Sequence, residues 1–513
     1  MANIWIKKPM EAYEADIKKS ELKRVLGKWS LTAIGIGAII GGGIFVLTGT
    51  GAYYHAGPAL ALSFVIAGIA CVFAALCYAE FASILPVEGS AYAYAYGTVG
   101  EVFAWVIGWG LILEYAMGSM TVAVSWSGYF AKFLTMFGIH LPNWLTTDPQ
   151  TFAAAGGTGF SMNLPALLIV LFVISILVRG TKGAAKANNF IVVLKVSAII
   201  FVIIAGLFFI NVENWTPFIP APTIITENGV SHEAYGYAGV VAGASAIFFA
   251  YVGFDAVSTQ AGEAINPKKD VPFAIITSLV ICTVLYILVS LVLTGMMHYT
   301  DFNPLGKYPD AIKAPVAYAF DIAGQAWAGY IITIAATVGL ISVLMVMIMG
   351  QSRIFLGMSK DGLIPKTFSK VNAATGVPRK NLMILGGVIS VVAAFTPIND
   401  LAHMTSFGTL FAFTMVCVAV WILRVKQPEL PRSFRVPFLP VIATLGILIN
   451  IYLIINLSIE AQTYSFIWLI IGVVIYFLYS KKHSNLQNGG FGETFKAEQE
   501  PLEKVDIDID NKD

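Results

Sequence analysis

The sequence predicts an all-α polytopic membrane protein with 12 transmembrane helices, of which ten form a core with an inverted five-plus-five repeat. Three observations predict this fold: an apolar composition, uncharged runs of about 20 residues, and helix-breaking residues in two of those runs. Hydrophobic residues make up 57% of the 513 residues and charged residues only 12%, whereas a typical soluble protein has roughly 25% charged residues. Lipid is therefore the expected environment of most of the chain.

The uncharged runs are each near the length that a helix needs to cross a bilayer. A transmembrane barrel would instead show alternating segments of about ten residues, so helices are the expected structure. Spans one to ten belong to the core at 30–425, and two further spans lie in 426–482. The predicted spans are 31–54, 60–84, 98–126, 164–180, 187–210, 237–262, 271–297, 326–352, 381–398, 403–424, 437–457 and 463–480.

The positions of lysine and arginine predict the orientation, because loops rich in these residues stay on the cytoplasmic side. Seven of them precede Ser30, so segment 1–29 is predicted to be cytoplasmic, and an even number of spans places the C-terminus there too. The predicted outer loops contain only Lys132, Lys307 and Lys313. The predicted inner loops contain Arg179, Lys182, Lys186, Lys268, Lys269, the basic residues between Arg353 and Lys380, Arg424, Lys426, Arg432 and Arg435. We expect a multi-pass protein of the cell membrane.

Other bulk properties exclude several classes of function. A formal net charge of +1 argues against a nucleic-acid partner. The four cysteines lie inside predicted spans and the six histidines show no metal-ligand spacing, so no metal or other cofactor is expected. The first 29 residues lack the apolar region of a cleavable signal peptide. Segment 483–513, rich in Glu, Asp, Lys and Asn, is predicted to be a disordered cytoplasmic tail.

Three consecutive glycines, Gly41, Gly42 and Gly43, lie near the middle of the first predicted span. Each costs about 1 kcal/mol of helix propensity relative to alanine. Close helix packing uses small residues four apart, which accounts for Gly37 and Gly41 but not for three glycines in a row. We therefore expect an unwound segment whose backbone groups bind protein or a polar ligand. A dinucleotide-binding loop is not expected, because it needs a preceding strand and a βαβ unit.

A second interruption lies in the sixth predicted span, where Gly253, Asp255 and two hydroxyl residues break an aromatic run. A carboxylate in a spanning segment is a functional candidate, because an unpaired charge is expensive there. Aspartate is also a preferred N-cap residue, so we expect Asp255 to cap the second half-helix, with direct ligand contact as the alternative. Either role requires a broken helix.

Interruptions five spans apart are what an inverted repeat produces, and such repeats place a binding site at the membrane midplane between the broken helices. The N-terminus of a half-helix offers N–H groups to an anion, and a C-terminus offers carbonyl groups to a cation. A zwitterion such as an α-amino acid matches both ends. The sequence therefore predicts a site for a carboxylate and an ammonium group.

Glu114 is a second carboxylate deep in a span, and Gly110 and Gly118 share its helix face at four-residue spacing. Another helix or a ligand can approach that face closely. Glu114 is expected to recognise a polar or cationic ligand side chain or to titrate during function; a protonated carboxyl group hydrogen-bonded between helices is the alternative.

Lys195 lies five residues from the predicted inner end of the fifth span, about 7 to 8 Å along a helix. Its side chain could therefore extend to the interface. Extension to the interface is the alternative to the hypothesis that we favour, which is a buried ammonium that releases and rebinds a proton, so that no sodium ion is needed.

Several motifs together resemble the amino acid, polyamine and organocation transporters, within them the bacterial relatives of the cationic amino acid transporters. The resemblance covers about Leu26 to Lys482. The motifs are the glycine-rich segment 35–49, the segments 77–83, 111–115 and 248–258, Gly350 to Arg353 with Asp361 to Pro365, and Phe434 to Pro437.

The resemblance implies a leucine-transporter-like core of ten helices with two added at the C-terminus. By position, it implies that a substrate carboxylate binds at Ile39, Gly41, Gly42 and Gly43, and that its ammonium binds at Phe249, Ala250 and Val252. Glu114 matches an acid that faces the substrate pocket. Lys195 matches a lysine at the ion position of sodium-coupled relatives, which favours H+ as the coupling ion.

Two departures limit this comparison, since relatives commonly have Thr at the position of Gly42 and Asp at that of Gly110. We therefore expect a broad amino acid permease that is not an enzyme, with the preference between neutral and cationic substrates open. An amino acid exchanger, or a membrane sensor that binds without transporting, would use the same pocket. The oligomeric state and any small accessory membrane subunit also stay open.

Overall fold

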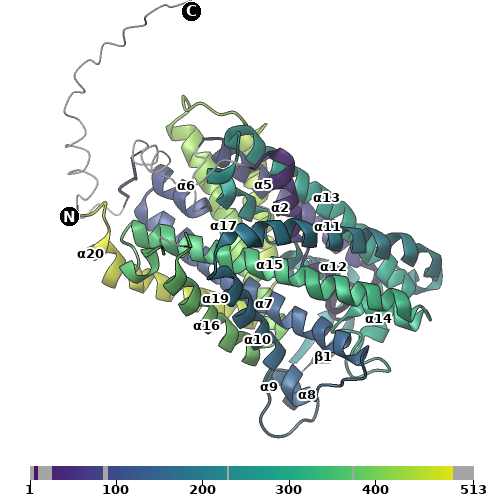
Figure 1. The fold of residues 1–513 in the computed structure, drawn as a ribbon. Coiled ribbons are helices and arrows are strands. Elements are labelled where there is room, and N and C mark those ends of the chain that lie inside the picture. Colours follow the sequence, from purple (N-terminus) through teal and green to yellow (C-terminus); the bar gives the residue numbers. More distant parts are fainter. Residues whose placement is uncertain (1–4, 10–25, 85–89, 228–229, 373–374, 489–513) are drawn as a thin grey trace, which may run out of the picture.

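The computed structural model describes residues 5–9, 26–84, 90–227, 230–372 and 375–488 and shows a bundle of long helices (Figure 1). In this described part, eight helical segments are long and apolar enough to cross a membrane, and two further apolar helices are shorter. The eight are Leu47–Ile84, Glu101–Thr135, Phe190–Phe209, Gly236–Thr259, Pro267–Met296, Ala326–Lys360, Ile398–Lys426 and Ile459–His483, and the two are Leu164–Leu177 and Leu439–Ile455. All 12 predicted spans coincide with helical structure. The count of 12 membrane crossings and the inverted repeat stay predictions.

The long helices begin and end close to the predicted span limits, and several are longer. Helices α7 and α15 each have 35 residues, because both continue beyond the apolar run into polar ends. The helices of the bundle are α5 (Leu60–Ile84), α7 (Glu101–Thr135), α10 (Leu164–Leu177), α11 (Thr181–Gly206), α13 (Pro267–Met296), α15 (Ala326–Lys360), α16 (Arg379–Phe395), α17 (Ile398–Lys426), α18 (Leu439–Ile455) and α19 (Ile459–Ile475).

The first predicted span is divided into short pieces. Helix α2 (Lys28–Ile39) ends before Ile40 and Gly41, whose backbone is extended, and α3 (Gly42–Phe45) and α4 (Leu47–Gly51) follow. We call residues 39–43 the first break. The interruption lies at the run of glycines that predicts it.

The sixth predicted span is also divided. Helix α12 (Gly236–Ala246) tightens into the 3₁₀ segment η5 (Ile247–Tyr251), and a second 3₁₀ segment, η6 (Asp255–Glu263), follows. Between them Gly253 has φ +120°, in the region that favours glycine. A Cβ atom there would also lie 2.9 Å from the Ala38 carbonyl. We call residues 249–255 the second break.

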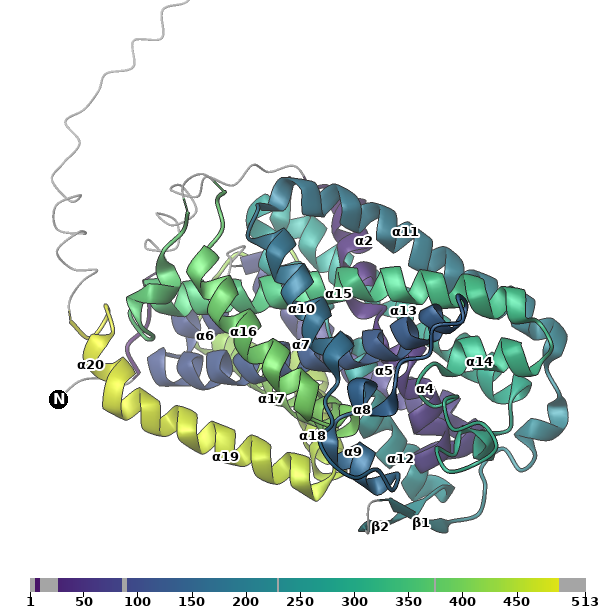
Figure 2. The ribbon, with the colours of Figure 1, turned by 60° about the horizontal axis from the view of Figure 1, so that its bottom comes forward.

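The bundle packs in two groups around the broken helices. Helix α5 packs along α13, which also contacts α2, while α7 packs against α15 and α17. Figure 2 shows α11 and α19 at opposite edges of the bundle, with α15 crossing between them. These edge helices expose large apolar side chains such as Phe190, Ile204, Phe466 and Ile470, as lipid-facing surfaces do.

Smaller elements gather at the two ends of the bundle. In both views α8, α9 and the antiparallel hairpin β1–β2 lie at one end, the predicted outer side, and α6 and α20 lie at the other (Figures 1 and 2). Most of them lie outside the predicted spans, except η3 and η9, which end two of those spans, and the first residues of η1. They are η1 (Ala52–Ala56), η2 (Gly57–Ala59), α6 (Ser90–Thr98), α8 (Asn143–Thr146), α9 (Pro149–Ala154), η3 (Leu207–Phe209), η4 (Val212–Trp215), β1 (Thr223–Glu227), β2 (Val230–Ala234), η7 (Tyr299–Phe302), α14 (Pro315–Ile322), η8 (Lys366–Ser369), η9 (Tyr476–Ser480) and α20 (Lys481–His483).

Both ends of the described chain are bound to the predicted inner end of the bundle. The Lys8 ammonium forms a buried ion pair with Asp361 at 3.0 Å. The buried Glu101 carboxylate accepts hydrogen bonds from the hydroxyl groups of Tyr476 and Ser484. The packed chain therefore extends into the segment expected as a disordered tail, of which residues 489–513 lie outside the described part.

Candidate functional site

The two breaks touch each other inside the bundle. Helix α3 packs against η5, and a Cβ atom on Gly43 would overlap the backbone of Ala250. On the other side, Gly253 packs against Ala38 at the end of α2. The structure therefore brings together residues 39–43 and 249–253, the two segments that the sequence interpretation placed in one site.

The carbonyl groups at the end of α2 are bound by side chains from other helices. A helix leaves its last carbonyl groups without intrahelical partners. The Tyr286 hydroxyl donates to the Ile39 carbonyl at 2.8 Å, and Lys195 donates to the carbonyl groups of Gly37 and Ile40. The first break is thus stabilised by donors from α13 and α11.

Lys195 lies at the centre of this arrangement, and its side chain is fully buried. Besides the two carbonyl groups, its ammonium donates to the Ser342 hydroxyl of α15 at 3.1 Å. Instead of extending toward the predicted interface, the side chain connects α11 to α2 and α15. A cation at the C-terminal end of α2 is also favoured by the dipole of that helix.

The second break contains an acidic group, which a tyrosine of another helix binds. The Tyr115 hydroxyl of α7 donates to Asp255 Oδ2 at 2.7 Å, and Asp255 is fully buried at the first position of η6. Oδ1 of Asp255 has no hydrogen-bond partner among the described residues. The Asp255 carboxylate is thus bound to a side chain of α7, and its role as a helix cap stays a prediction.

Glu114 lies beside this pair and is fully buried. In the described part of the chain neither of its carboxyl oxygens has a hydrogen-bond partner. Helix α17 covers its glycine-lined face: a Cβ atom on Gly408 would lie 3.0 Å from the Glu114 nitrogen, and one on Gly110 would lie 3.0 Å from Phe411. A helix therefore approaches that face.

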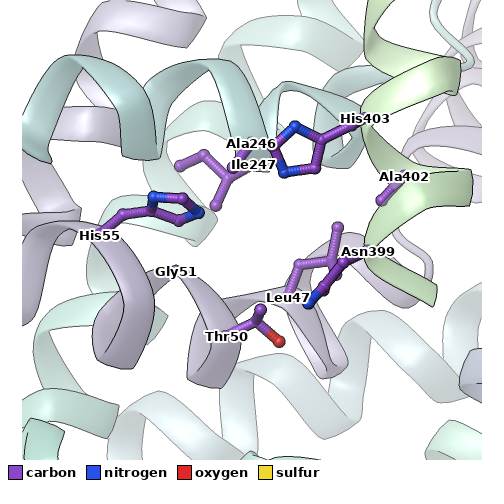
Figure 3. Close-up of a pocket in the computed structure, with 9 residues that line it drawn as sticks. All are labelled: Leu47, Thr50, Gly51, His55, Ala246, Ile247, Asn399, Ala402 and His403. Atoms are coloured by element: carbon purple, nitrogen blue, oxygen red, sulfur yellow. The ribbon is translucent and has the colours of Figure 1, made fainter. Parts of the chain in front are cut away.

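A small cavity lies on the predicted outer side of the breaks, between η1, α4, η5 and α17. Figure 3 shows His55 and His403 facing each other across it, with Thr50 and Asn399 at its lower edge. The two ring centroids are 6.2 Å apart. The cavity volume is about 10 Å³, which holds about one water molecule. This space cannot contain an amino acid in the conformation described.

Sequence reasoning missed the partners of the breaks. Tyr115, Tyr286 and Ser342 look like ordinary residues of apolar spans, and the histidines around the outer cavity carry no spacing signal. The only signal in the sequence for Tyr115 is that it directly follows Glu114. Which carbonyl or carboxylate a hydroxyl group reaches depends on helix packing, and no local pattern records that.

Comparisons with known proteins give a consistent result. The model of the family described as amino acid permease matches residues 26–478. The chain is 45% identical to the branched-chain amino acid permease BcaP of Bacillus subtilis, over 91% of this chain and 95% of that protein. It is 42% identical to the methylthioribose transporter of the same organism, over 95% of this chain and 100% of that protein. It is 36% identical to the vacuolar cationic amino acid transporter 4 of Arabidopsis thaliana, over 80% of this chain and 64% of that protein.

Proposed function

The chain belongs to the amino acid permease family, within the amino acid, polyamine and organocation superfamily and related to the cationic amino acid transporters, and on that premise we propose that it transports α-amino acids by proton symport. The names of the relatives are those of transporters, not of enzymes. The protein is thus a multi-pass membrane protein, and we place both termini in the cytoplasm on the positions of its basic residues.

The proposed substrate site lies between the two breaks. Ile39, Gly41, Gly42 and Gly43 would bind the substrate carboxylate, and the backbone of Phe249, Ala250 and Val252 would bind its ammonium. The contact between Gly43 and Ala250 supports this placement, because it brings the two segments to the same point. The Phe249 carbonyl already accepts from the Val252 N–H group at 3.1 Å, so an ammonium would share that oxygen.

The observation that carries the proposal is the buried Lys195 ammonium on the Gly37 and Ile40 carbonyl groups. An ammonium has three donors and no acceptor. Loss of one proton would leave an amine that binds these carbonyl groups more weakly, which would release the end of α2 beside the substrate site. Proton binding would thereby be coupled to movement of the first break, as alternating access requires.

Glu114 would face the substrate side chain and would take part in proton transfer. Its carboxylate has no protein partner in the described residues, so a cationic or hydroxyl-bearing substrate could provide one. Relatives named for branched-chain and for cationic amino acids are both similar to this chain over most of its length. We therefore propose a broad amino acid specificity.

Transport of methylthioribose is a second candidate, favoured by the 42% identity over the whole length of that transporter. A thiosugar carries neither the carboxylate nor the ammonium that the two breaks would bind. Competition therefore separates the candidates: excess methylthioribose should leave amino acid uptake unchanged if the site is specific for zwitterions.

Uptake of a labelled amino acid mixture into proteoliposomes tests the main proposal. The measurement compares an inward proton gradient with no gradient, with sodium absent throughout. Accumulation that depends on the gradient supports proton symport and ranks the substrates. Uptake that requires an internal amino acid would indicate an exchanger, and binding without uptake would indicate a sensor; either result contradicts symport.

A further inference from the structure

Ser125 of α7 has a hydroxyl group that the packing of the protein leaves unused. Its side chain is 1% exposed. The hydroxyl oxygen has no hydrogen-bond partner within the described residues. Buried polar groups are nearly always hydrogen-bonded, and a bilayer offers no water to replace a missing partner. The hydroxyl therefore needs a partner that the described protein does not supply.

Neighbouring hydroxyl groups on the same helix are satisfied. Ser119 donates to the Tyr115 carbonyl at 2.7 Å, and Thr121 donates to the Met117 carbonyl at 2.8 Å. Serine and threonine in helices commonly donate in this way to the carbonyl four residues earlier. Ser125 has the same option on α7 and does not use it, so its hydroxyl points elsewhere.

The position of Ser125 shows where its hydroxyl points. A Cβ atom on Gly42 would overlap the Ser125 hydroxyl and would lie 3.8 Å from the edge of the Phe249 ring. The hydroxyl thus fills the space that a side chain at position 42 would occupy, between the first break and the second. Other buried serines without a partner in the described part, such as Ser352 and Ser480, belong to other regions of the chain.

We propose that Ser125 donates a hydrogen bond to the carboxylate of the bound substrate. This inference rests on the proposed function and adds a contact from α7 to a site otherwise built from the two breaks. An apolar ring such as Phe249 cannot accept a strong hydrogen bond, and backbone N–H groups are donors as well. A carboxylate accepts from both kinds of donor.

Binding to the purified full-length protein tests the assignment by calorimetry. The probes are L-leucine and L-lysine, and for the tighter of the two also its amide, which lacks the carboxylate charge. Loss of a hydrogen bond to a charged group weakens affinity by roughly 10- to 100-fold. Ser125→Ala should weaken binding of the amino acid by that factor and change binding of the amide by less than about threefold. The control Ser119→Ala should change neither by more than about twofold.

Moving the hydroxyl group from position 125 to position 42 provides a second test. Gly42→Ser alone places a side chain onto Ser125 and should abolish binding. Gly42→Ser combined with Ser125→Gly removes both colliding atoms, the Ser125 hydroxyl and its Cβ atom, and restores one hydroxyl in the same space, so affinity should return to within about threefold of wild type.

The outcomes separate this assignment from the proposed function. Unchanged affinity of Ser125→Ala, or equal weakening of the amino acid and its amide, would overturn the role of Ser125 while the permease proposal stands. If wild-type protein bound neither amino acid, the proposed function and this assignment would both be overturned.

Discussion

The two breaks differ in where the charge lies: an ammonium from another helix binds the first break, whereas the second break itself contains a carboxylate. The first break presents carbonyl groups at the end of α2, and a lysine ammonium and a tyrosine hydroxyl donate to them. The second break begins a new helical segment at Asp255, whose carboxylate accepts from Tyr115. The carbonyl groups of the first break are acceptors that any helix end exposes, whereas the acceptor of the second break is the side chain of Asp255.

The partners of both breaks come from intact helices. Lys195 belongs to α11, Tyr286 to α13 and Tyr115 to α7, none of which is interrupted within the described residues near these positions. An unwound segment in a membrane thus depends on neighbours whose own backbone hydrogen bonds are complete. Substitutions at the two kinds of position should therefore have different effects. A substitution in a break should abolish substrate binding, whereas a substitution of a partner should change proton coupling or stability.

The largest expected effect is at the contact between the breaks. Gly43→Leu places a side chain onto the Ala250 backbone, so amino acid affinity should fall about 100-fold or more. The matched control is Gly387→Leu, because a Cβ atom on Gly387 meets nothing within 4 Å. Calorimetry on both variants measures the difference, and near-normal affinity of Gly43→Leu would rule out a substrate site between the breaks.

Lys195→Met should uncouple transport from protons. Methionine fills a similar volume but donates no hydrogen bond, so accumulation driven by a one-unit pH gradient should fall from about tenfold to none. Binding of the amino acid should remain measurable, since Lys195 is not among the proposed substrate contacts. Lys307→Met in a predicted outer loop serves as control. Unchanged accumulation in Lys195→Met would leave this lysine with a structural role alone.

The hydroxyl donors of the two breaks can be compared directly. Tyr115→Phe removes the hydrogen bond to the Asp255 carboxylate and should lower the free energy of unfolding by about 1.5 to 3 kcal/mol. Tyr286→Phe removes a hydrogen bond to a neutral carbonyl and should cost only about 0.5 to 1.5 kcal/mol. Equal losses in denaturant unfolding of the two variants would contradict the view that the second break depends on charge.

The smallest effect is expected at Glu114. Glu114→Gln replaces a charged acceptor by a neutral one of the same shape, a difference of about 1 kcal/mol for one hydrogen bond, so the ratio of lysine to leucine uptake should fall by roughly threefold to tenfold. Glu213→Gln, at an exposed position, is the control. An unaltered substrate profile would place Glu114 outside the substrate pocket.

The sequence predicted the features that depend on local composition. Apolar runs predicted the helices, and Gly41 to Gly43 and Gly253 predicted where two of them break, because glycine clusters and buried charges are costly in a membrane helix. It did not predict the site partners Tyr115, Tyr286, Ser342 and Ser125. The first three are identified only by hydrogen bonds to residues more than 100 positions away in the sequence. Ser125 is identified by its close approach to Gly42, which has no Cβ atom.

The binding of both chain ends to the predicted inner face has a consequence for biosynthesis. Lys8 and Asp361 are separated by 353 residues, and Glu101 and Ser484 by 383. At a synthesis rate of about 5 to 20 residues per second, roughly 20 to 70 seconds pass before either pair can form. The contact between Glu101 and Ser484 can form only after 484 of the 513 residues have been made, so the inner face closes only when translation is nearly complete, and a chain that ends before Ser484 lacks this contact.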